Sequence, residues 1–77
     1  MLQLTALDEG IVLDEAKVRR IKYLLLQFIP ARRCDVHLGP GVKIVVPGHG
    51  VNELAPGIRA EVESTLGCAV VVAEFAD

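Results

Sequence analysis

Two cysteines and two histidines are the residues of this 77-residue chain with the most distinctive chemistry. Together such side chains can bind zinc, which requires its ligands to converge tetrahedrally. Cys34 and His37 stand three positions apart in a segment typical of a strand, so their side chains point to opposite faces. Neither a metal site nor a cysteine–histidine catalytic pair is therefore expected, and Cys34 and Cys68 are interpreted as small core residues. We expect no catalytic residue, no metal and no cofactor.

The stretch VVPGHGVNE, residues 45–53, has the layout of a strand, a glycine turn and a helix start. That layout binds phosphate when backbone N–H groups at the turn are free. The dinucleotide fingerprint needs a glycine where Glu53 stands, and no Walker lysine follows. We interpret the segment as an ordinary loop with an exposed His49.

The segment KVRRIKYLLLQFIPARR, residues 17–33, holds six of the eight basic residues and no acidic one. Net charge is only −2, and acidic residues gather in the last third of the chain. Two interpretations remain open: a surface for an acidic partner, or one solvated face of a helix whose other face is core. The basic residues are Lys17, Arg19, Arg20, Lys22, Arg32 and Arg33.

Alternating and helical hydrophobic periodicities locate the elements that position these residues. Asp14 is a plausible N-cap for the first helix, which Pro30 ends, and Gly39-Pro40-Gly41 indicates a hairpin. Asn52 is a candidate cap for the second helix, with Gly67 after its last turn. The predicted strands are 2–7, 33–38, 42–46 and 69–76. The first predicted helix runs from Asp14, its cap, to about residue 28 or 29, and the second ends at Leu66.

The element order is therefore β-α-β-β-α-β within one α+β domain, residues 1–77. Right-handed crossovers let such a chain form an antiparallel sheet with both helices on one face, the ferredoxin-like two-layer arrangement. The last strand is then an edge of the sheet.

Alternation along the strands divides their side chains between two faces. The face expected to meet the helices carries Leu2, Leu4, Ala6, Cys34, Val36, Leu38, Val42, Ile44, Val46, Ala69, Val71, Ala73 and Phe75. The helical stripes expected to meet it are Val18, Ile21, Leu25 and Phe28, and Ala55, Ile58, Val62 and Leu66. The open face is expected to carry Gln3, Thr5, Leu7, Arg33, Asp35, His37, Lys43, Val45, Val70, Val72 and Glu74.

Two surfaces are the candidate contacts with a partner. The outer side of the first helix combines tyrosine, leucine and arginine, a mixture common in interfaces. The open sheet face combines charged and β-branched residues, which indicates partial cover by another subunit. The candidate partner-binding residues are Arg19, Arg20, Tyr23, Leu26, Gln27, Asp35, His37, Lys43, Val45, Val70, Val72 and Glu74.

The leading hypothesis is a non-enzymatic protein–protein interaction domain, either a homo-oligomer or a subunit of a larger complex. Edge-to-edge pairing of the last strand, with Glu74 as its only charged residue, is one concrete form. The first alternative is nucleic-acid binding through the basic segment.

The second alternative rests on DEGIVL, residues 8–13, which is loosely similar to the loop after the first strand of ACT domains. That resemblance implies a regulatory domain for a small ligand. No apolar run is long enough to cross a membrane and no signal peptide is recognisable, so a cytoplasmic location is expected.

Overall fold

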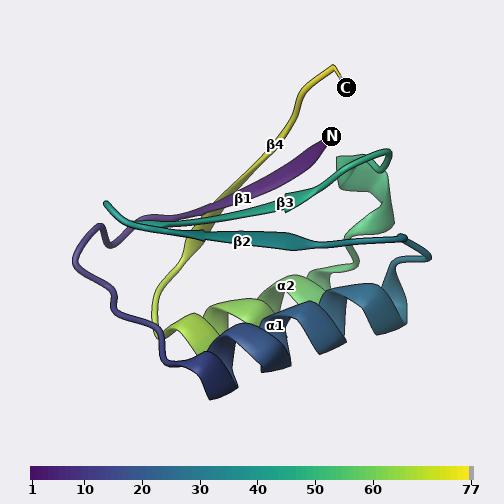
Figure 1. Cartoon of the computed structure of the whole chain (residues 1–77). Helices are drawn as coiled ribbons and strands as arrows, with labels where there is room; N and C mark the ends of the chain where they lie inside the picture. Colours follow the sequence, from purple (N-terminus) through teal and green to yellow (C-terminus); the bar gives the residue numbers. More distant parts are fainter. Residues whose placement is uncertain (77) are drawn as a thin grey trace.

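The computed structural model describes residues 1–76, which form a four-stranded antiparallel sheet and two helices. The strand order is β2-β3-β1-β4, and both helices lie against one side of the sheet, while the other side is uncovered (Figure 1). This confirms the predicted α+β class and the edge position of the last strand. The elements are β1 (Leu2–Ala6), α1 (Glu15–Phe28), β2 (Asp35–Leu38), β3 (Val42–Val46), a 3-10 turn η1 (Val51–Glu53), α2 (Pro56–Leu66) and β4 (Val70–Glu74).

Helix α1 begins and ends where its sequence predicts. The Asp14 carboxylate accepts a hydrogen bond from the Lys17 N–H at 2.8 Å, which satisfies one of the free donors of the first turn. The helix ends at Phe28, and Ile29 turns into extended backbone immediately before Pro30.

Helix α2 begins later than predicted. The N-cap is Ala55, without a side-chain hydrogen bond, and Asn52 lies in η1, so the prediction of an Asn52 cap is wrong. The proline ring of Pro56 disfavours helical backbone at the preceding residue, and Ala55 is accordingly extended, with φ −66° and ψ 148°. The end of the helix is as predicted, because Gly67 has φ 85° at the C-cap.

The hairpin between β2 and β3 has the predicted register. Leu38 lies opposite Val42, and His37 lies opposite Lys43. Gly39 and Gly41 both have positive φ, which a residue with a Cβ adopts only with strain.

The core fills the space between the sheet and the helices. Its centre is fully buried and consists of Leu2, Leu4, Ile21, Leu25, Ile29, Ile44, Val46, Val62 and Val70. Burying an aliphatic side chain of this size contributes about 1.5–3 kcal/mol, so these residues are the main source of stability.

Apart from residues of β4, three predicted core residues lie largely outside this core: Phe28, Leu38 and Ala55, the last of which is the exposed N-cap of α2. Phe28 is 53% exposed and Ile29 takes its place, because the chain leaves the helix after Phe28 and turns the next side chain inward. Leu38 is also exposed, since it stands at the end of β2, an edge strand.

The largest correction concerns the two faces of β4. Residues directly opposite each other share a face, and Leu4 pairs with Val72 while Ala6 pairs with Val70. Val70, Val72 and Glu74 therefore lie on the helix side, and the predicted assignment is wrong by one residue. The segment AVVVA is apolar at every position, so no alternation of polar and apolar residues shows which of its side chains face the helices. The residues that lie on the open face instead are Ala69, Val71, Ala73 and Phe75.

Candidate functional site

The open face of the sheet has two halves of different chemistry. The half formed by β2 and β3 carries charged side chains, as predicted: Asp35 pairs with Val45, and His37 pairs with Lys43. Asp35 accepts a hydrogen bond from Arg33 at 3.0 Å, which forms a local ion pair. Val45 is buried although it lies on this face.

The half formed by β1 and β4 carries exposed apolar side chains beside the polar Gln3 and Thr5, and sequence reasoning assigned most of these apolar residues to the core. Leu7 is 61% exposed, Val71 is 50% exposed and Phe75 is 49% exposed. Ala73 lies between Val71 and Phe75 in the chain. Across the strand pair, Thr5 lies opposite Val71 and Gln3 lies opposite Ala73. We call this group the open-face strip; it consists of Leu7, Val71, Ala73 and Phe75.

The outer side of α1 presents part of the predicted contact patch. Tyr23 and Leu26 are exposed, as are Arg19 and Gln27. Arg20 differs from them because its guanidinium lies 3.7 Å from the Glu61 carboxylate of α2. Arg20 therefore connects the two helices, and it is less available to a partner than the other four.

The free edge of β4 is partly closed by side chains of α2. Arg59 Nη2 donates a hydrogen bond to the Val70 carbonyl at 2.9 Å, and the Val70 N–H donates to Glu63 Oε2 at 2.9 Å. The two side chains thus occupy the positions that a neighbouring strand would use. Sequence reasoning missed this pair; its only signal was the i, i+4 spacing of opposite charges on one helix.

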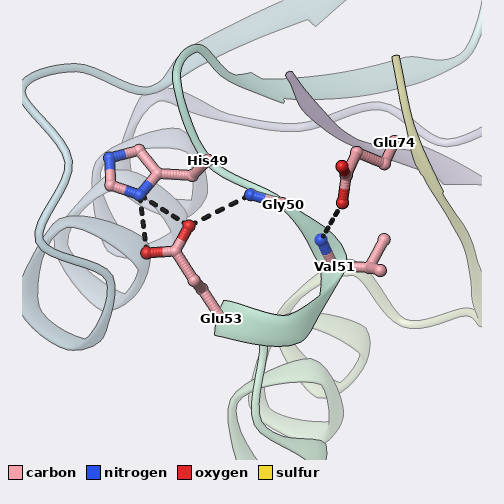
Figure 2. A network of polar contacts seen from close by, with 5 residues as sticks. All are labelled: His49, Gly50, Val51, Glu53 and Glu74. Atoms are coloured by element: carbon pink, nitrogen blue, oxygen red, sulfur yellow. Dashed lines mark hydrogen bonds and ion pairs between the residues drawn. The ribbon is translucent and has the colours of Figure 1, made fainter. Parts of the chain in front are cut away.

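The loop that joins β3 to α2 is held by two carboxylates (Figure 2). His49 Nδ1 donates to the Glu53 carboxylate, with both oxygens at 2.8 Å, and the Gly50 N–H donates to Glu53 Oε2 at 3.0 Å. From the far side, Glu74 accepts from the Val51 N–H at 2.9 Å. The two hydrogen bonds that Glu53 accepts lower the pKa of its carboxyl. The bond from His49 has the larger effect and the bond from the Gly50 backbone the smaller.

The loop geometry excludes the phosphate cradle that the glycines of this segment resemble. The N–H groups of Gly50 and Val51, which an anion would need, are already bonded to carboxylates of the protein itself. A Cβ at Gly50 would meet the Glu74 carboxylate, which explains why a glycine stands there. The interpretation of His49 as an exposed loop residue is wrong, because its side chain is only 17% exposed.

The two cysteines occupy different environments. Cys34 is buried, and desolvation raises the pKa of its thiol to about 11, against the lowering effect of nearby Lys22. Cys68 is only partly buried and packs against the edge of the core. Within residues 1–76, no three His, Cys, Asp or Glu side chains are grouped so that they could hold a metal ion.

The basic residues of the first helix and the segment after it do not form a single free surface. Arg20 and Arg33 are engaged in ion pairs with acidic neighbours. Lys22 is partly buried, whereas Lys17, Arg19 and Arg32 are exposed. Nucleic-acid binding and binding of a small ligand both stay predictions.

Comparisons with protein-family models, with curated proteins and with solved structures gave no match to this chain. None of the helices within residues 1–76 combines the length and the apolar character that a membrane crossing requires.

Proposed function

We propose that this domain associates with a second copy of itself, and that the open-face strip is the contact. The observation that supports the proposal is the exposure of three large apolar side chains on the uncovered face: Leu7 directly after β1, Val71 in β4, and Phe75 directly after β4. A contiguous apolar patch on an uncovered sheet face is a feature of interaction surfaces. The charged half of the same face carries Asp35 and Lys43, whose opposite signs favour one orientation of the partner.

Packing of face against face is favoured over pairing of one β4 edge with another. Pairing along the full length of two β4 edges requires the N–H and C=O groups of Val70, and Arg59 and Glu63 already occupy both. Two hydrogen bonds would have to break in each copy before a new strand could bond there. Face packing leaves them intact and covers the open-face strip, which edge pairing would leave in water.

The expected affinity is modest. Each of the three large side chains is about half exposed, so covering one contributes about 1 kcal/mol, or about 6 kcal/mol for two copies. Association costs about 4–15 kcal/mol in lost freedom of motion, which nearly cancels this gain. At the low end of that cost about 2 kcal/mol remains, and ion pairs across the charged half of the face must add about as much again to give the dissociation constant near one millimolar that we expect.

The proposal is tested by sedimentation velocity from about ten micromolar to about one millimolar protein. The weight-average mass should rise toward twice the monomer mass, and Val71→Lys should suppress the rise. The matched control is Val12→Lys, since Val12 is 88% exposed outside the strip and outside any strand. A wild-type protein that stays monomeric at the highest concentration contradicts the proposal.

Salt separates self-association from the nucleic-acid alternative. Binding driven by phosphate contacts weakens steeply as salt rises, because counterions are released on binding. Association through apolar side chains lacks this dependence.

We also infer that the chain has the ferredoxin-like arrangement. In support, β1 and β2 are both antiparallel to β3, which lies between them, and α1 connects them. In the same way α2 connects β3 and β4 around β1. Two such interlocked β-α-β units are the defining feature of that arrangement.

A further inference from the structure

Along the free edge of β4, the outward backbone groups of one residue are hydrogen-bonded to side chains, and within the described residues those of the next outward residue are not. The Leu7 N–H donates to the Ala69 carbonyl at 3.0 Å, so odd-numbered residues of β4 direct their backbone groups toward β1. The N–H and C=O groups of Val70 and Val72 therefore point away from the sheet. At Val70 both groups are bonded to α2 side chains. At Val72 they have no partner among residues 1–76.

An apolar depression adjoins this open position. Val72 lies on the helix side of the sheet, and its side chain forms one wall. The opposite wall comes from η1 and the start of α2, which the bond from Val51 to Glu74 holds beside β4 (Figure 2). The depression is lined by Val51, Leu54, Pro56, Arg59 and Val72.

We propose that this edge binds an extended peptide segment of another protein, which adds to the sheet antiparallel to β4. The peptide residue opposite Val72 exchanges two backbone hydrogen bonds with it, as in other cases of strand addition. Because opposite residues share a face, the side chain of that residue enters the depression. The lining there is mostly apolar, so the residue is apolar.

Charge specifies a second position of the peptide. In an antiparallel pair, the residue two positions after the apolar one points to the same face and toward Val70, where the peptide bends away because Arg59 and Glu63 occupy the backbone groups of Val70. Arg59 borders that point, and its Nε lies 3.9 Å from Glu63, too far for a strong bond between them. An acidic side chain at this position of the peptide gives Arg59 a second carboxylate. The preferred peptide is thus an apolar residue, any residue, then Asp or Glu.

A second copy of the chain fits this edge less well than a peptide does. An antiparallel pair of β4 strands centred on Val72 places Val70 of each copy opposite Glu74 of the other. Full pairing then breaks the bonds of Val70 to Arg59 and Glu63 in both copies. A peptide avoids this cost, because it bends away beyond Val72 and meets Arg59 through a side chain.

The probe is a blocked heptapeptide, Thr-Thr-Leu-Thr-Asp-Thr-Thr, titrated into isotopically labelled protein and followed by amide chemical shifts. We expect saturable shifts at Val72, Val51 and Leu54, with half-saturation near one millimolar, the weak end of measurable affinities. The control peptide has asparagine in place of the aspartate, which removes the carboxylate from Arg59 and keeps the leucine. It should bind roughly threefold more weakly, the effect of losing one exposed ion pair.

Three variants locate the peptide. Val72→Pro deletes only an outward N–H, so it removes a bond to the peptide and none to β1. Leu54→Lys places a charge in the depression, and it provides the same test if the proline variant does not fold. Both should abolish the shifts. Val71→Lys changes the neighbouring side chain on the opposite face and should leave them unchanged, which separates this site from the open-face strip.

Three results overturn the proposal. One is the absence of shifts at Val72 and the depression at millimolar peptide. Another is equal binding by folded Val72→Pro and the wild-type protein. The last is a shift of the Val72 amide that depends on protein concentration without peptide, which assigns the edge to a second copy.

Discussion

Val70 and Val71 are identical neighbours in one strand, yet they have opposite roles. Val70 is 1% exposed and packs in the core, whereas Val71 is 50% exposed on the uncovered face. Their local sequence is apolar on both sides, so residue type does not distinguish them. The difference comes from the pairing of β4 with β1, which places Val70 opposite Ala6 and Val71 opposite Thr5. One strand thus contributes both to stability and to a candidate contact surface.

The sharpest test of this comparison introduces a charge at each position. Val70→Lys buries an unpaired ammonium, at an expected cost of about 3–5 kcal/mol or more. A domain of this size has a total stability of roughly 4–12 kcal/mol, so this loss removes a large share of it. Val71→Lys should change the free energy of unfolding by less than about 0.5 kcal/mol, as surface substitutions do. Urea denaturation followed by circular dichroism measures both; equal losses would mean that the face assignment is wrong.

The end of α1 also has a buried residue next to an exposed one, and the expected difference in stability loss between the two is smaller. Ile29 is fully buried, whereas Phe28 is mostly exposed. Ile29→Ala should cost about 2–5 kcal/mol, since it removes a buried aliphatic side chain and leaves a cavity. Phe28→Ala should cost less than about 1 kcal/mol, although phenylalanine is the larger residue. Thermal unfolding of the two variants decides the order, and a larger loss for Phe28 contradicts it.

The two thiols extend the comparison to reactivity, with the smallest effect on stability. A neutral disulfide reagent should label Cys68 rapidly at pH 8 and Cys34 only through unfolding, because the Cys34 thiol is buried and protonated. The pKa of Cys34 is raised to about 11 in the folded state, which favours the protonated thiol. Its contribution to stability is therefore complete below the unfolded pKa of about 8.5 and is lost as pH rises toward 11. A Cys34→Ser variant should lack that alkaline loss of stability; comparable labelling rates for the two thiols in the native protein contradict the prediction.

The sequence predicted the elements far better than it predicted the functional surfaces. Asp14, Pro30 and Gly67 act within a few residues of their own position, through caps, a missing N–H and a permissive φ. The hairpin register followed for the same local reason, from two glycines with positive φ. The start of α2 was missed even though its cause is local, because the effect of Pro56 on Ala55 competes with the capping preference of Asn52.

The candidate surfaces depend on contacts that no local pattern encodes. Arg59 and Glu63 reach Val70 only because α2 lies beside the edge of β4. Glu74 reaches Val51 across 23 positions of the chain. Arg20 was predicted to contact a partner, but in the structure it forms an ion pair with Glu61 on the other helix.

The sequence by itself determined which segments are helices and strands and in what order they occur, because hydrophobic periodicity and turn residues act over short range. For most strands it also determined which face is buried, since polar and apolar residues alternate there. Only the tertiary structure decided the faces of β4, the closure of its edge at Val70 and the opening at Val72. The physical reason is that an apolar strand without alternation takes its phase from the hydrogen-bond ladder of its neighbour, and that ladder forms only when β4 and β1 meet.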